Sequence, residues 1–171
     1  MRNHPSDGLF RRVRTERSPR AIPPTLPTPT AADPERQTLR VGAKALITNL
    51  DRVLLIKECH GDSSTFWTLP GGGVESGESF TTCLRREIRE EIRCRATVGE
   101  SIGRYVYHHT SSPTTTVYAI FDAALLSEPE PNREERVLDY AWSEPSELPA
   151  TTLDPVERFI ERSVTGTDGG R

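Results

Sequence analysis

The sequence lacks the features of a disulfide-rich, zinc-binding or membrane-spanning protein. It has only three cysteines (Cys59, Cys83 and Cys94), an odd number with no C-x-x-C pair. Neither a disulfide framework nor a zinc site is therefore expected, and we interpret the thiols as reduced in a cytoplasmic protein. No run of about 18 apolar residues occurs, which predicts no transmembrane helix and no membrane partner. No apolar segment follows the basic N-terminus, so no secretory signal is expected.

An excess of basic residues is also absent. The formal net charge is −3, from 22 lysines and arginines against 25 acidic residues. A general nucleic-acid binder usually has a basic excess, so no stable nucleic-acid partner is expected. A local phosphate-binding site remains compatible with this balance, because it needs only local charge.

The length of 171 residues suits one domain with additional chain around it. Residues 1–38 are predicted to be a disordered tail rich in proline and arginine, since the tract AIPPTLPTPT at 21–30 has neither a strand nor a helix period. Its arginines indicate either a weak acidic or nucleic-acid contact or an unselected leader, and short basic tails favour the leader. Residues 39–165 are the predicted domain, and 166–171 a disordered C-terminal tail.

The pattern of apolar residues within 39–165 predicts strands mixed with helices. A helix is expected over 79–93 with Ser79 as its N-cap, and another after Pro155. The order of elements predicts an α/β sandwich rather than a regular βαβ array. Strands are expected at 41–48, 53–56, 66–69, 103–107, 114–126 and 137–142, the first two forming a hairpin.

The helix predicted at 79–93 has acidic residues on its apolar side. At about 100° per residue, Glu87 and Glu91 fall in the apolar sector and Glu90 lies beside it. A water-facing stripe of ion pairs explains the arginines of this helix but not these glutamates. Clustered carboxylates that are partly buried need compensation, and one arginine would compensate one acid but not three. Magnesium prefers carboxylate oxygens, so the pattern predicts a metal site. The predicted solvated face holds Arg85, Arg86, Arg89 and Arg93.

A glycine triplet, residues 71–73, precedes this helix. Glycines let the backbone turn sharply and approach a ligand closely, so that a carbonyl or amide reaches a metal or phosphate. A flexible turn is the plainer explanation of the triplet taken alone.

Together these residues resemble the Nudix box, G-x5-E-x7-R-E-U-x-E-E-x-G-U, in which U is aliphatic. Gly72 fits the first glycine, Glu78 the next glutamate, and residues 86–91 (REIREE) fit R-E-U-x-E-E. The segment 142–149 is similar to the family's common C-terminal segment, and the resemblance covers about residues 40–159. Arg93 and Cys94 depart from the final glycine and aliphatic residue, which bears on the turn after the helix more than on the chemistry.

The resemblance implies a Nudix-type α/β/α sandwich with a mixed β-sheet and one motif helix. It also implies a hydrolase that uses magnesium, or manganese in its place, to cleave the pyrophosphate bond of a nucleoside diphosphate linked to another moiety. By resemblance, Arg86 orients a motif glutamate and Glu78 supports the loop and helix. Which glutamate is the general base stays open. The implied metal-binding or catalytic groups are Glu87, Glu90, Glu91 and the carbonyl of Gly72.

The substrate expected from the resemblance is a nucleotide-type small molecule. Oxidised nucleoside triphosphates, ADP-ribose, dinucleoside polyphosphates and nucleotide sugars are all candidates. Many relatives form homodimers, so a homodimer is an open alternative to a monomer. The residues considered for substrate contact are Glu78, Tyr107 and the loop acids Glu134 and Glu135. Further candidates are Phe66, Trp67, Tyr105 and the pair His108–His109. Most of these residues are explained more simply as core side chains or as side chains exposed to solvent.

The alternative function is a non-catalytic Nudix-like module that binds a nucleotide ligand and regulates. Such modules tend to lose motif glutamates and usually carry a DNA-binding domain. Here the acids are present and no helix-turn-helix pattern is evident, so an enzyme is favoured.

Overall fold

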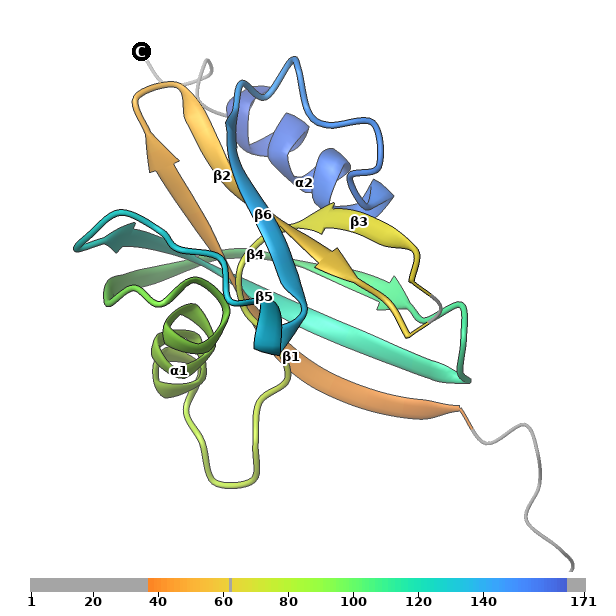
Figure 1. The fold of residues 1–171 in the computed structure, drawn as a ribbon. Helices are drawn as coiled ribbons and strands as arrows, with labels where there is room; N and C mark the ends of the chain where they lie inside the picture. The colour runs from red at the N-terminus through yellow and green to blue at the C-terminus, as the bar shows by residue number, and fades with distance from the viewer. Residues whose placement is uncertain (1–36, 62, 166–171) are drawn as a thin grey trace, which may run out of the picture. The chain divides into compact units, whose positions relative to one another are not determined.

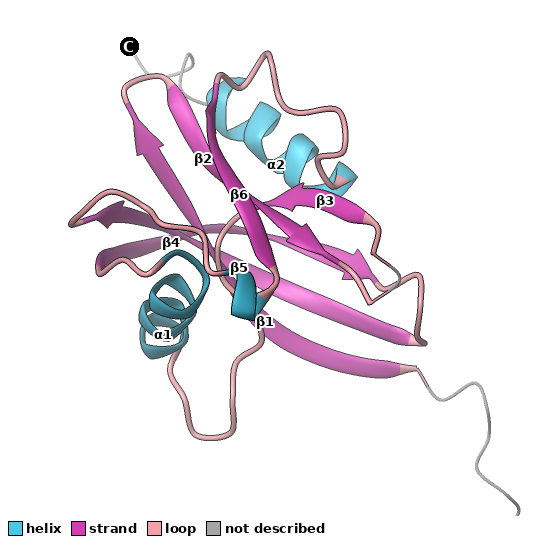
Figure 2. Cartoon of the chain, in the orientation of Figure 1, coloured by secondary structure: helices cyan, strands magenta, loops and turns pink. Residues whose placement is uncertain are grey.

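The computed structural model describes residues 37–61 and 63–165. The predicted tails lie outside these residues, apart from 37 and 38. No helix in the described part of the chain is long and apolar enough to cross a membrane. The elements are β1 (Thr38–Asn49), β2 (Arg52–Cys59), β3 (Thr65–Thr68), α1 (Phe80–Ile92), β4 (Ala96–His108), β5 (Thr114–Leu125), the 3-10 turn η1 (Arg133–Glu135), β6 (Val137–Ser143) and α2 (Asp154–Thr165), as Figure 2 shows.

The strands form a mixed sheet in the order β3-β2-β1-β5-β4, with β6 paired to β2. The predicted hairpin exists, but β1 pairs with β2 only at the turn, where Thr48 faces Val53. Most of β1 instead runs parallel to β5, from the pair Thr38–Thr114 to the pair Ile47–Ala123. The mixed sheet predicted from the sequence is therefore confirmed, and β1 connects its two halves.

Two apolar cores lie on the two faces of the sheet, because side chains alternate along each strand. On one face, Ala43, Ala45 and Ile47 of β1 pack in the same cluster as Leu84 and Ile88 of α1. On the other face, β2 contributes to a cluster with α2, whose members include Val53, Leu55, Val156, Phe159 and Ile160. Figure 1 shows α1 and α2 on opposite sides of the strands. This arrangement is the predicted α/β/α sandwich.

Strand β4 begins at Ala96, seven positions before the predicted start at 103. Its pairing with β5 shifts register between Val98 and Ser101 and again between Ser101 and Gly103. A bulge interrupts the alternation of inward-facing and outward-facing side chains along a strand. The sequence of this segment therefore lacks the alternating pattern by which a strand is predicted. The short turn η1 was not predicted either.

Helix α1 begins and ends at defined caps. Ser79 has an extended backbone, and its Oγ accepts a hydrogen bond from the Thr82 amide at 3.1 Å, which confirms it as the N-cap. At the other end Arg93 adopts a left-handed conformation (φ 51°), and its amide donates to the Arg89 carbonyl. Its guanidinium reaches Glu130 and Asn132, both at 3.1 Å. Arg93 thus ends the helix at the position where the motif has glycine. The left-handed turn that glycine would favour forms here with arginine instead.

Replacing Ser79 by alanine removes the N-cap acceptor. The expected result is a loss of about 1 kcal/mol in the free energy of unfolding, measured by urea denaturation. Ser79→Asp keeps an acceptor at this position and is expected to stay close to the original stability. The exposed Ser76→Ala variant is the control. Equal stability of Ser79→Ala and Ser76→Ala would contradict the assigned cap.

Candidate functional site

The glycine loop is fixed along β1 by backbone hydrogen bonds. The Ala43 amide donates to the Gly72 carbonyl at 2.9 Å, and the Val74 amide donates to the Val41 carbonyl at 3.1 Å. Gly71 has φ +123°, and a side chain there would collide with the Ala43 carbonyl. The loop is therefore an ordered extension of the sheet edge, which excludes the plainer explanation of a flexible turn.

Two of the three motif glutamates point into this loop. Glu91 is 8% exposed, and its Oε2 accepts a hydrogen bond from the Gly71 amide at 2.8 Å. The Glu87 carboxyl group lies against Gly72, since a Cβ on Gly72 would be 2.5 Å from Glu87 Oε1. Glu90 lies at the rim, with 44% of its side chain exposed. The prediction that Glu87 and Glu91 face inward, beside the glycine loop, is confirmed.

Arg86 is the cation that joins the acids, and its predicted place on the solvated face is wrong. Its side chain is 25% exposed. Nε and Nη2 donate to the two carboxylate oxygens of Glu78, each at 3.0 Å. Nη1 donates to Glu87 at 2.8 Å and to Glu90 at 3.1 Å. Arg86 lies at the edge of the acidic sector of the helix, and its long side chain reaches back over the preceding turn. The other predicted solvated arginines, Arg85, Arg89 and Arg93, are exposed.

Burial dominates the electrostatics of the inner acids. Burial raises the pKa of Glu87, although Arg86 lowers it. Burial also raises the pKa of Glu91 well above its usual range, against the opposing effects of Lys44 and the Gly71 amide. Hydrogen bonds from Arg86 hold the pKa of Glu78 below its usual range. Glu78 is thus stabilised as a carboxylate, whereas Glu87 and Glu91 lack part of the positive charge that their ionised forms need.

Sequence reasoning missed a second cation, Lys44 of β1. It is 5% exposed, and its Nζ lies 3.4 Å from Glu58 Oε1. Burial lowers its pKa, but the carboxylates of Glu58 and Glu91 raise it, and the net shift is upward. Lys44 therefore stays charged between these two acids. The available signal was a single lysine inside the otherwise small and apolar strand segment 41–48.

Cys83 lies under the same loop. Its Sγ donates weakly to the carbonyl oxygens of Gly72 and Gly73, at 3.8 and 3.5 Å. Burial raises the pKa of this thiol to about 11, so it remains protonated near neutral pH. The three cysteines are free, in agreement with the predicted absence of disulfides.

A recess of about 180 Å³, lined largely by aromatic side chains, surrounds the Lys44–Glu58 pair. It contains Tyr105, Tyr107 and Phe66, which the sequence analysis considered for substrate contact, whereas Trp67 does not line it. Of the histidine pair, His109 lines the recess, and His108 instead bonds to Thr115. The remaining lining residues are Lys44, Glu58, His60, Thr68, Tyr118 and Leu153.

The loop acids Glu134 and Glu135 lie on η1, which is attached to the end of α1. Asn132 donates to the backbone carbonyls of Glu90 (2.7 Å) and Glu91 (2.8 Å). Both loop glutamates are exposed, and within the described residues neither carboxylate bonds to the motif acids. The structure therefore brings their loop to the site but not their side chains.

The donor set beside the loop suits a hard divalent cation. In residues 37–61 and 63–165, no three His, Cys, Asp or Glu side chains form a metal-binding group. Magnesium, however, usually keeps several waters and uses only one or two protein carboxylates. Glu87 and Glu91 supply two, against the Gly71–Gly72 backbone, and both have raised pKa values that a cation would reverse.

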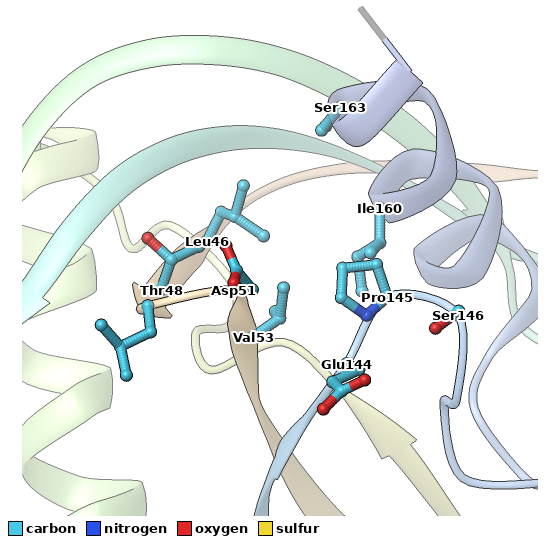
Figure 3. Close-up of a pocket in the computed structure, with 10 residues that line it drawn as sticks. Leu46, Thr48, Asp51, Val53, Glu144, Pro145, Ser146, Ile160 and Ser163 are labelled. Atoms are coloured by element: carbon cyan, nitrogen blue, oxygen red, sulfur yellow. The ribbon is translucent and has the colours of Figure 1, made fainter. Parts of the chain in front are cut away.

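A larger apolar hollow of about 540 Å³ lies between the β1–β2 turn and α2 (Figure 3). Leu46, Val53, Pro145 and Ile160 line it. None of the motif glutamates borders it. The hollow is therefore separate from the acids and the glycine loop.

Comparisons with known proteins agree with this geometry. The family model "NUDIX domain" matches residues 38–162. The protein "Nucleoside triphosphatase NudI" of Escherichia coli is 35% identical over an alignment of 115 residues, and the match covers 60% of this chain and 80% of that protein. NudI of Escherichia fergusonii is 33% identical over an alignment of 129 residues, and the match covers 66% of this chain and 87% of that protein.

Solved structures show the same fold. The MutT NUDIX hydrolase of Burkholderia pseudomallei superposes with a TM-score of 0.66 at 25% identity, covering 72% of this chain and 97% of its own. The MutT protein of Methanosarcina mazei has a TM-score of 0.68 at 20% identity, covering 77% and 97%. The ordered glycine loop, the acidic helix and these matches lead to one assignment: the chain belongs to the NUDIX family and is a hydrolase of that family.

Proposed function

We propose that this hydrolase cleaves the pyrophosphate bond of a nucleoside diphosphate linked to another moiety, using magnesium or manganese. A nucleoside triphosphate falls within this class, because its third phosphate is such a moiety. The observation that carries the proposal is the pair of desolvated carboxylates, Glu87 and Glu91, turned against the Gly71–Gly72 backbone. The name of the NudI relatives, nucleoside triphosphatase, supports it.

Glu87, Glu91 and the Gly72 carbonyl would hold the metal ion, with Glu90 at its exposed side. When bound, a divalent ion neutralises charge on the phosphoryl oxygens and orients the bond to be broken. Arg86 would keep Glu87 and Glu90 in place through its hydrogen bonds to both. Glu78 would in turn hold Arg86 by two bonds.

We infer that Glu91 takes the proton of the attacking water, with Glu90 as the other candidate. The Gly71 amide bonds to one carboxylate oxygen of Glu91, Oε2, and the other oxygen is in a position to accept that proton. The water oxygen forms a new bond to phosphorus while the bond from phosphorus to the bridging oxygen breaks. The leaving group departs as a phosphate or nucleotide. No observation favours the alternative of a non-catalytic binding module.

Replacing Glu91 by glutamine keeps the shape and the acceptor for the Gly71 amide but removes the base and its charge. We expect the turnover rate to fall at least about 100-fold, with thermal unfolding little changed. The measurement is product release from a panel of nucleoside di- and triphosphate derivatives with magnesium, manganese or EDTA. The control is Glu147→Gln, an exposed carboxylate in a distant turn. Near-normal turnover of Glu91→Gln, or no metal-dependent hydrolysis of any substrate, would refute the proposal.

A methyl group added at Gly72 tests the contact between loop and helix. The new Cβ would lie 2.5 Å from Glu87 Oε1, so the carboxyl group must move away from the loop. For Gly72→Ala we expect at least about a tenfold fall in turnover, since small displacements of positioned groups have large effects. Gly61→Ala, whose Cβ meets nothing within 4 Å, should retain full activity. Equal activity of the two variants would show that Glu87 need not lie against Gly72.

A further inference from the structure

The turn between β1 and β2 carries a leucine in a strained and almost fully exposed position. The pair Asn49–Arg52 closes a two-residue hairpin loop, and Leu50 is the first residue of that loop. Its φ of +53° lies in the left-handed region, where such loops normally have glycine or asparagine. Leu50 is 94% exposed, more than any other large apolar residue in the described part of the chain. The backbone thus adopts a costly conformation, although its own domain covers almost none of this side chain.

The apolar hollow of Figure 3 adjoins this turn, and Leu50 is one of its lining residues. Its volume of about 540 Å³ leaves room for a leucine side chain and its neighbours. A second hollow of about 470 Å³ shares Leu50, Asp51 and Glu144 with the first and adds the partly buried Trp142. A single exposed leucine is ordinary, but a protruding leucine between apolar hollows forms a patch of the kind that marks an interface.

A protruding side chain and a hollow on the same surface are self-complementary. In a dimer with a twofold axis both copies use the same surface, so a group that protrudes from one copy must meet a hollow in the other. A twofold axis close to the turn would let each Leu50 enter the hollow of the other copy. Trp142 adds an aromatic surface beside the turn, and aromatic residues are enriched at the centres of interfaces.

The charges at this surface also suit a second copy. Arg52 donates to Glu144 at 3.4 Å, and these side chains are 58% and 50% exposed. A long, exposed ion pair contributes little to stability, so Arg52 can exchange its partner for an acid of another copy. The exposed Asp51 makes no ion pair within residues 37–61 and 63–165. A partner with charge of one sign would be attracted by one of these groups and repelled by another, whereas a second copy brings both signs.

We propose that this surface joins two copies of the chain in a symmetric dimer, in which Leu50 of each copy fills the apolar hollow of the other. Burial of the leucine would offset the cost of its backbone conformation. None of the motif glutamates lines either hollow. The dimer is therefore separate from the proposed hydrolysis and can be tested without substrate or metal.

The first experiment is sedimentation velocity of the full chain over about a hundredfold range of concentration, since association follows mass action. The unaltered chain is expected to pass from monomer to dimer as its concentration rises. Leu50→Asn removes the apolar side chain but keeps a residue that tolerates the left-handed conformation. We expect its dimer dissociation constant to rise at least about tenfold. The control Leu39→Asn removes a leucine that is 70% exposed at the start of β1, and it should dimerise normally.

The variant Ser146→Trp tests the hollow itself. Ser146 is exposed and lines the hollow, so an indole there would occupy the space that receives Leu50. The dissociation constant should again rise at least about tenfold. Combining Ser146→Trp with Leu50→Asn should add little, because both remove the same contact. Ser112→Trp is the control, since it lies in the exposed turn before Thr114, which pairs with the start of β1 at the other end of the strand.

Urea unfolding at the lowest concentration shows whether each variant is folded, and if one variant is not, the other decides. A chain that stays monomeric over the whole range would overturn the proposal. So would a dimer whose dissociation constant is unchanged in folded Leu50→Asn or in folded Ser146→Trp. Growth into species larger than a dimer would also overturn it, because a symmetric contact closes at two copies.

Discussion

The hydrogen bonds of Arg86 to Glu78, Glu87 and Glu90 are the interaction on which the site depends. Carboxylates this close repel one another and lose solvation, so they cannot gather at the end of an apolar helix face without positive charge among them. Arg86 supplies that charge at the rim, and Lys44 supplies it in the interior beside Glu58 and Glu91. Two cations still face six carboxylates, including Glu58 and the exposed Glu75, which lies 3.9 Å from Arg86. The remaining lack of positive charge affects Glu87 and Glu91 most, because burial raises the pKa of both. A divalent ion bound there would supply positive charge.

Strand β1 links this charge balance to the fold. Its backbone holds the glycine loop on one side, and its parallel pairing with β5 holds Tyr118 on the other. Because Gly42 has no side chain, both the Gly72 carbonyl and the Tyr118 ring can approach β1 closely; a Cβ at this position would collide with both. The same strand carries Lys44, which faces both the acids and the aromatic recess. Strand β1 therefore contributes to both the site and the recess.

Much of this arrangement could be predicted from the sequence, because backbone periodicity determines it. The helical period placed Glu87 and Glu91 inward, and the strand patterns located all six strands. Periodicity fails where a long side chain turns away from its Cβ direction, as Arg86 does, or where bulges break the alternation, as in β4. It also does not predict the partner of a buried charge: Glu58 lies 14 positions from Lys44 in the sequence, and the two side chains meet only because the β1–β2 turn folds β2 back beside β1. The end of α1 at Arg93 required the actual backbone, since arginine rarely adopts a left-handed conformation.

The central claim is that Glu87 and Glu91 lack a positive charge that a divalent ion supplies. Electron paramagnetic resonance of Mn²⁺, titrated with the substrate-free protein, measures this directly. The account predicts saturable binding that is abolished when Glu87 and Glu91 are both replaced by glutamine in a variant that remains folded. Mn²⁺ binding that is unchanged in that variant, or absent from the unaltered protein, would contradict it.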